Sequence, residues 1–413
     1  MKTFNYRSLL AAVGLAALFA AGSRELHGQT AYWTNTSGGD WNLAANWDLD
    51  FLGINVVPAE ATNANLTTAG AVTVDYNAPM AATSFGALAV DGGAILNINA
   101  AGFTQDLGGA GTAPLTLGSG VVNVGAAGVW TATNGGTLTV NSGGDLNVAG
   151  NAYIAPIAAT APLAVALGGS VDVQTGGTLT LADGAGSTVT GSLSVTDGSL
   201  VLSNCTSLTI APGGAINVTN GTILQTNSPS GSIALGVNNN NTVTLFTMFG
   251  GTVTFDRVLD IRGRKTGFIM NGGTLNANGG TLLREGNTDD INRLVVNGGT
   301  ANLGAVEVNR TTSGGGLILS NGVINATSLR IGVANSTSYS TIYGGFLTNT
   351  GLFTICDRTN GAVGSTDRRA RLLVRGGTVV STGAGGIVVA NQSNNGVGGT
   401  AAALAGILDI NSG

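Results

Sequence analysis

Short runs in which apolar and polar residues alternate recur along most of this chain. In NGGTLTV, which begins at Asn134, and NGGTLNA, which begins at Asn271, an asparagine and two glycines precede the alternating run. Alternation with a period of two places every second side chain on one face of a β-strand. Glycine and asparagine tolerate the positive φ of a sharp turn. The pattern therefore predicts a turn followed by a half-buried strand, many times over.

The phrase recurs at a nearly constant spacing. Further examples begin at Asp91, Ser142, Thr175, Pro212, Phe249, Asn297, Asn321, Tyr343 and Arg375. In the second half, the glycines that begin the turn, at positions 250, 272, 298, 322 and 344, are separated by 22, 26, 24 and 22 residues. A unit of that length holds three strands of about five residues and their turns, which is one coil of a parallel β-helix.

We therefore predict an all-β fold, a right-handed parallel β-helix (β-solenoid) whose coils have lengths in the low twenties of residues. The hand follows from the rule for crossovers between parallel strands. With about 4.8 Å between stacked strands, roughly 14 coils give a rod about 70 Å long. No window after the first thirty residues has a helical period, so helix content should be very low.

The first 28 residues have the pattern of a secretory signal peptide. Lys2 and Arg7 precede an uncharged apolar run over residues 9–22, and small residues follow. The run is shorter than the roughly 20 residues of a membrane-spanning helix. We expect cleavage after position 22 or 28, secretion, and no transmembrane helix in the mature chain.

A second apolar stretch, residues 153–168, contains Pro156 and Pro162. It is too short to span a membrane, and proline disrupts both helices and central strands. We expect it to form an apolar insertion or loop.

Residues 29–83 differ in composition and pattern from the repeats, which occupy residues 84–413. Three of the four tryptophans, Trp33, Trp41 and Trp47, lie in the segment AYWTNTSGGDWNLAANWD, and a Val-Pro turn and the strand VTVD follow. This order, followed by successive N-G-G-T-L phrases, resembles bacterial autotransporter-associated β-strand repeat proteins. The resemblance implies a right-handed β-helix displayed at the bacterial cell surface, usually without catalysis.

Such proteins usually end in an outer-membrane barrel or a sorting anchor, and nothing before Gly413 resembles either. The sequence stops within a repeat phrase, ILDINSG. We therefore expect that the sequence is truncated at its C-terminus.

Two interpretations of the tryptophans remain open. Aromatic faces stack on sugar rings, so these residues are candidates for a ligand-binding platform. Alternatively, the rings close the N-terminal end of the solenoid, where unpaired strand edges and apolar core must be covered. Three large aromatic side chains cover much apolar area. We favour the cap.

Charge is divided between the two parts of the repeat region. Residues 29–256 contain 12 acidic residues and no Lys or Arg, whereas residues 257–413 contain 13 basic and 8 acidic residues. If sequence position is position along the rod, the rod has an acidic and a basic part. The basic residues cluster at Arg257, Arg262, Arg264 and Lys265, and at Arg368, Arg369, Arg371 and Arg375.

One hypothesis is that the basic part, with Arg368, Arg369, Arg371 and Arg375 as candidate ligand-binding residues, contacts an anionic surface polysaccharide or the acidic part of another copy in end-to-end association. We favour the alternative of a solvated surface in which arginines pair with Asp256, Asp260, Asp357 and Asp367. Nucleic acid is excluded as a partner because the chain carries an export signal and a net charge of −5.

Parallel β-helices also carry pectin-degrading enzymes, so catalysis is tested on the residues. Residues 287–290, Asn-Thr-Asp-Asp, resemble part of the polygalacturonase motif, but the accompanying Gly-His-Gly and Arg-x-Lys elements are missing. His27 is the only histidine. Neighbouring carboxylates on a strand also point to opposite faces, which does not suit glycoside hydrolysis.

A Ca²⁺-dependent polysaccharide lyase is the best enzymatic alternative. It would use Arg293 as the base, with Glu285, Asp289 and Asp290 binding the ion. An exposed turn with local ion pairs is the simpler interpretation of these residues.

The two cysteines, Cys205 and Cys356, lie 151 residues apart. We expect both to be buried as small apolar side chains, too far apart for a disulfide. We expect no metal site and no cofactor. The chain should be a non-catalytic structural or adhesive stalk, with a carbohydrate-binding adhesin and the lyase as alternatives.

Overall fold

The computed structural model describes residues 29–58, 62–67, 71–79, 85–106, 115–157, 160–227, 231–237, 242–263, 265–284, 293–309, 316–332, 338–357, 368–391 and 404–410. Within these ranges the protein is all-β, and its only helical element is a 3-10 turn, η1 (Ala44–Asn46). No helix in the described part of the chain has the length and apolar character needed to cross a membrane.

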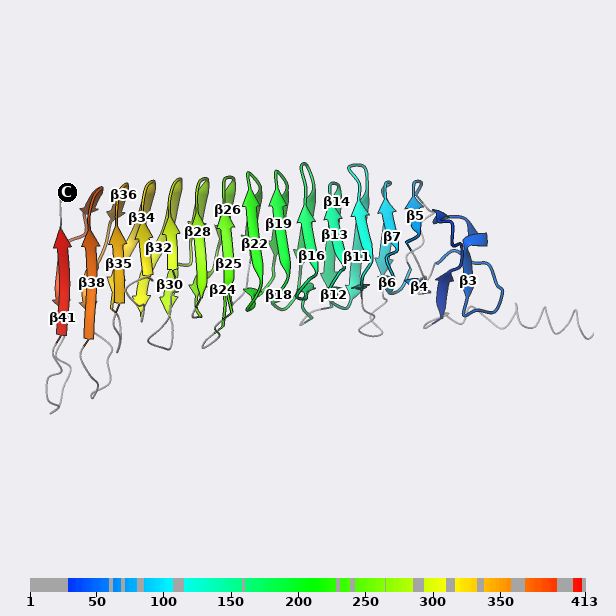
Figure 1. The fold of residues 1–413 in the computed structure, drawn as a ribbon, viewed down its shortest axis with the longest axis horizontal. Helices are drawn as coiled ribbons and strands as arrows, with labels where there is room; N and C mark the ends of the chain where they lie inside the picture. The colour runs from blue at the N-terminus through cyan, green and yellow to red at the C-terminus, as the bar shows by residue number, and fades with distance from the viewer. Residues whose placement is uncertain are drawn as a thin grey trace, which may run out of the picture.

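Most coils consist of three strands, and the coils stack along one axis from the N-terminal to the C-terminal part of the chain (Figure 1). One coil consists of β16 (Ser170–Val173), β17 (Thr178–Ala182) and β18 (Ser187–Val189). The chain then returns as β19 (Ser192–Thr196), which pairs in parallel with β16. The predicted parallel β-solenoid, with coils of about 24 residues, is confirmed.

One strand of each coil belongs to a 15-stranded sheet. With β16 and β19, its members are β2 (Gly39–Asp40), β5 (Thr73–Tyr76), β7 (Ile95–Ile98), β10 (Val121–Val124), β13 (Asp145–Val148), β22 (Ala215–Thr219), β25 (Thr244–Met248), β28 (Thr266–Met270), β31 (Arg293–Val296), β33 (Gly316–Leu319), β35 (Ser338–Ile342), β38 (Arg368–Val374) and β41 (Leu404–Ile410).

The other strands form a 26-stranded sheet that runs along the same axis in two ranks. With β17, the first rank comprises β8 (Phe103–Asp106), β11 (Val129–Gly135), β14 (Asn151–Pro156), β20 (Ser199–Ser203), β23 (Thr222–Thr226), β26 (Thr252–Phe255), β29 (Thr274–Ala277), β36 (Phe346–Asn349) and β39 (Thr378–Ser381). With β18, the second comprises β6 (Leu88–Asp91), β9 (Leu115–Leu117), β12 (Leu138–Val140), β15 (Leu163–Val165), β21 (Leu208–Ile210), β24 (Ser232–Leu235), β27 (Val258–Ile261), β30 (Thr281–Arg284), β37 (Phe353–Asp357) and β40 (Ile387–Asn391). Two long strands, β32 (Thr300–Asn309) and β34 (Val323–Ile331), belong to both ranks.

The N-terminal module attaches to the first coils through β1 (Thr30–Trp33). This strand pairs antiparallel with β3 (Trp47–Leu49) and parallel with β4 (Asn63–Thr67), which continues into the second rank. The module therefore lies directly on the open end of the stack.

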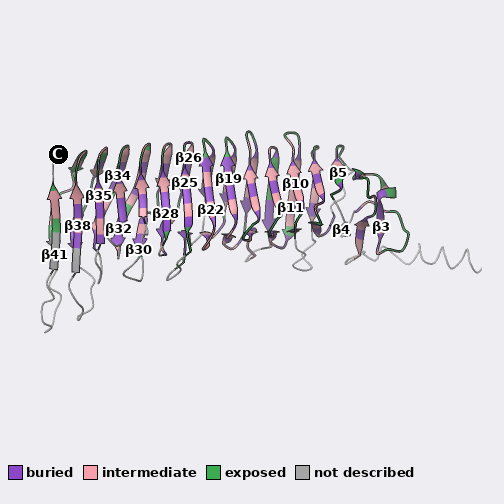
Figure 2. Ribbon diagram, viewed as in Figure 1, coloured by how far each residue is buried: buried purple, intermediate pink, exposed green. Residues whose placement is uncertain are grey.

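Side chains that point alternately inward and outward along each strand produce the core. In β17, Leu179 and Leu181 point inward and are fully buried, whereas Thr178 and Thr180 are half-buried on the outer face. The same alternation colours strand after strand in Figure 2. Outward-facing amides form a second ladder, in which Asn123 donates to Asn97 at 2.8 Å and Asn147 to Asn123 at 2.9 Å.

Residues 153–156 and 163–165 do not form the loop that we expected from the composition of residues 153–168. They belong to β14 and β15, which pair in parallel with the strands of the neighbouring coils. Pro156 is the last residue of β14 and Pro162 immediately precedes β15, and strand boundaries are where sheets accept proline.

The turns before the first-rank strands carry a column of glycines at positive φ. Gly299, Gly322 and Gly345 have φ values of 81°, 92° and 77°, and a Cβ on any of them would lie 2.3–2.6 Å from a carbonyl oxygen of the coil before. The phrase NGV has a single glycine, Gly322, and this residue occupies the place that the second glycine holds in the phrase NGGT. Thr300 consequently pairs with Val323, so this coil has 23 residues and not the 24 that we counted.

Candidate functional site

The three N-terminal tryptophans form the packed interior of the module. Their exposed fractions are 3% for Trp33 and 0% for Trp41 and Trp47, and the rings of Trp33 and Trp41 meet that of Trp47 edge to face. Trp41 also contacts Phe85 and Phe103 of the first coils. Because the ring faces are enclosed, they offer no stacking surface to a sugar, and their packing suits a cap.

The structure describes two side chains of the second arginine cluster, those of Arg371 and Arg375, and each has a different neighbour. Arg371 pairs with Asp409 on the neighbouring strand β41, and the exposed Arg375 lies over the ring of Tyr343 at 5.8 Å. The backbone of Arg368 and Arg369 belongs to β38, and their side chains lie outside the described part. Asp409, which we did not name as a partner, neutralises one of the four candidates.

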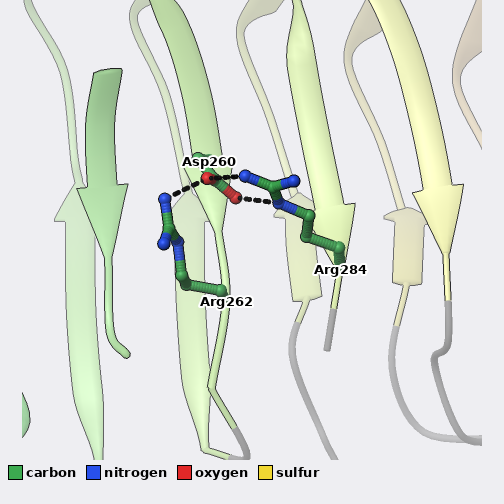
Figure 3. Close-up of polar contacts among 3 residues, drawn as sticks. All are labelled: Asp260, Arg262 and Arg284. Carbon is green, nitrogen blue, oxygen red and sulfur yellow. Dashed lines mark hydrogen bonds and ion pairs between the residues drawn. The ribbon is translucent and has the colours of Figure 1, made fainter. Parts of the chain in front are cut away.

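One member of the first arginine cluster, Arg262, shares a buried carboxylate with Arg284, which we did not assign to a cluster; the carboxylate is that of Asp260 on β27 (Figure 3). Its side chain is 1% exposed. Arg284 donates to it through Nε at 3.0 Å and Nη2 at 2.7 Å, and Arg262 donates through Nη2. These hydrogen bonds raise the pKa of Arg284 above its ordinary value. The interpretation in which arginines pair with a nearby aspartate is therefore correct for Asp260. Arg264 lies outside the described residues.

The residues of the enzymatic alternatives lie mostly outside the described residues, namely Glu285, the segment 287–290 and His27. Arg293 is described as the first residue of β31, half-buried and paired with Gly267 and Gly316. Within the described ranges, no group of three His, Cys, Asp or Glu residues could hold a metal ion.

Both cysteines are buried, as predicted, and neither forms a disulfide. Cys205 donates its thiol to the carbonyl oxygen of Leu181 at 3.0 Å. Burial raises the pKa of Cys205 to about 11. A thiol with that pKa is protonated at neutral pH and is not a nucleophile.

Two exposed aromatic residues of one turn, with an arginine over the first ring, were missed at the sequence level. Arg375 lies over the ring of Tyr343, and Phe346 follows three residues later as the first residue of β36; we name these three residues the Tyr343 patch. Tyr343 is 51% exposed and Phe346 57% exposed. In the phrase YGGF these two aromatics stand where other coils have asparagine and threonine, as in NGGT. The turn does not require them, so this departure from the repeat was the available signal.

A second exposed apolar surface lies in the N-terminal module, at residues 50–54, which we name the Phe51 loop. Phe51 is 68%, Leu52 65% and Ile54 49% exposed. Asp48 accepts hydrogen bonds from the backbone of Gly53 and Ile54, which closes the loop. Phe51 has a φ of 57°, an outlier for a bulky side chain, and its ring stacks on Tyr32 at 4.1 Å.

Comparison with protein-family models, with curated proteins and with solved structures found no match. The class of the protein is therefore defined by its own fold: a parallel β-solenoid with a tryptophan-filled N-terminal module. The similarity to autotransporter-associated repeats stays a prediction from the sequence.

Proposed function

We propose that this protein is an exported, non-catalytic structural solenoid that serves as a stalk or spacer at the bacterial cell surface. The observation that carries the proposal is the continuity of the stack. Each strand of the 15-stranded sheet pairs with the next in unbroken order from β2 to β41. Its interior is filled by side chains such as Val171, Leu193 and Ile216, which are 0–1% exposed.

Such an architecture converts sequence length into axial length. Each coil adds about 4.8 Å, so the 15 strands of the sheet span about 70 Å. Nearest-neighbour contacts between similar supersecondary units stabilise the rod without a distant partner. The leader-like first 28 residues support export, and the outward asparagine and threonine side chains suit an aqueous environment.

The experiment that tests the proposal exposes the purified protein to acidic and neutral polysaccharides, with and without Ca²⁺. Bound fraction and polysaccharide chain length are recorded together. A stalk leaves chain length unchanged and binds no polysaccharide saturably. Saturable binding supports the adhesin instead, and Ca²⁺-dependent cleavage overturns the non-catalytic role and directs attention to Arg293.

A further inference from the structure

Two exposed apolar surfaces lie near opposite ends of the described rod, the second of them two coils before the last strand, β41. The Phe51 loop follows β3, beside the N-terminal end, and the Tyr343 patch includes the first residue of β36, near the other end (Figure 1). Formation of the coil does not require either surface. Phe51 has a strained, positive φ, and Tyr343 and Phe346 stand where other coils have the polar residues asparagine and threonine. Backbone strain retained in an exposed loop favours a role in an interaction.

The charges of the two surfaces are complementary. Asp50 belongs to the Phe51 loop and Asp48 precedes it, and every charged residue between positions 29 and 256 is acidic. The Tyr343 patch carries Arg375 over the tyrosine ring. Tyrosine and arginine are enriched among the residues that dominate the binding energy of protein interfaces. Surfaces of opposite charge also orient the two partners before they make contact.

We propose that the Phe51 loop of one copy docks on the Tyr343 patch of a second copy. The occupant is another copy because the acidic apolar loop and the basic aromatic patch belong to the same chain. The contact joins different surfaces of two copies, so it is heterologous and propagates into chains of rods rather than closing into a dimer. This inference extends the proposed structural role and rests on it.

The small size of both surfaces predicts weak association. Three apolar side chains meet two aromatics, which is less than the area of a standard stable interface. Oligomers should therefore form only at high protein concentration and should shorten on dilution. Salt that screens the acidic and basic fields should weaken the association.

Variants that restore ordinary residues test the contact without disturbing the fold. Phe51→Asn removes the ring and places at positive φ a residue that tolerates it. Tyr343→Asn with Phe346→Thr restores the repeat phrase NGGT. Each change should raise the self-association constant Kd at least about 30-fold in sedimentation velocity, as expected for loss of an aromatic hot spot. Phe249→Asn, at the same turn position in another coil, is the matched control and should leave Kd unchanged.

Mixing separates this contact from any other association. The Phe51→Asn protein keeps an intact patch, and the doubly substituted protein keeps an intact loop. The mixture should form dimers through one contact and no longer chains, whereas each variant alone stays monomeric. Circular dichroism on each variant confirms that the fold is kept.

Several outcomes overturn the proposal: wild-type protein that stays monomeric at every concentration, variants that associate like wild type, or a Phe249→Asn protein that loses association equally. Saturation of the Tyr343 patch by a soluble anionic glycan, with no self-association, assigns the patch to a glycan and overturns it too. The structural role fails separately, since polysaccharide cleavage refutes that role whatever the oligomeric state.

Discussion

Substitution of alanine for Gly299 tests the close stacking of successive turns. Gly299 has a φ of 81°, and an added Cβ would lie 2.3 Å from the carbonyl oxygen of Gly273. That oxygen accepts a hydrogen bond from the backbone N–H of Thr300 at 2.9 Å. The methyl group therefore strains the backbone of its own residue and displaces a ladder hydrogen bond between coils.

The magnitude follows from three contributions. Left-handed φ in a non-glycine residue costs about 1–2 kcal/mol, weakening of the ladder bond about 0.5–1.5 kcal/mol, and overpacking against the neighbouring turn about 1–3 kcal/mol. Gly299→Ala should therefore lower the free energy of unfolding by about 2.5–6.5 kcal/mol.

Gly176→Ala is the matched control, because Gly176 has a φ of 77° and no atom within 4 Å of the position of an added Cβ. It should lose only the conformational contribution, about 1–2 kcal/mol. Guanidinium unfolding followed by far-UV circular dichroism measures both variants, and hydrogen exchange at the Thr300 amide reports the local effect. Equal losses in the two variants would refute the argument that turns of successive coils are in contact.

Three further predictions concern the buried charge, the buried thiol and the coil as a unit. Asp260→Asn should lower the free energy of unfolding by about 2–3 kcal/mol, below the roughly 3–5 kcal/mol of a fully buried pair because Arg262 and Arg284 are 28% and 50% exposed. Glu307→Gln, at a pair with Arg330 whose carboxylate is 32% exposed, should cost about 1 kcal/mol; similar losses in denaturant titrations would contradict this. Because burial raises the pKa of Cys205 from 9.0 to about 11, the neutral thiol contributes its full stability below pH 9, and this is lost as the pH rises through 11; Cys205→Ala should abolish that part of the decline in denaturant midpoint, and an unchanged decline would be evidence against it. Deletion of residues 178–198 joins Gly177 to Ser199, the register partner of Thr178, and should leave a folded rod one coil shorter by about 4.8 Å; a protein without the β-sheet circular dichroism signal would show that coils are not independent units.

The strands could be predicted where the local pattern of turn glycines and alternating apolar residues agrees with the tertiary fold. The phrase beginning at Asn271 gave β29 because its glycines supply the turn and its alternation supplies the buried face. Residues 153–168 gave β14 and β15 against expectation, because proline at a strand boundary removes no ladder bond. Spacing alone could not show whether Gly322 corresponds to the first or the second glycine of the turn. Only its strand register with the preceding coil shows that the first glycine is the missing one.

The candidate surfaces were less predictable than the fold. Composition identified the tryptophans and the arginine clusters, and the cap interpretation of Trp41 agrees with its burial. Sequence could not pair Arg371 with Asp409, because that contact is made across two coils whose register is set by the whole stack. The Phe51 loop carried no repeat pattern from which its exposure could be inferred.

The central claim is that sequence position equals axial position along a rod. Tyr153 and Val380 are both exposed and are connected by nine register steps through the first rank of the 26-stranded sheet. Spin labels at these two positions, with Cys205 and Cys356 replaced by alanine, should give a distance of about 43 Å by pulsed electron paramagnetic resonance. A distance shorter or longer by one coil spacing, about 5 Å or more, would contradict the continuous stack and the spacer role that depends on it.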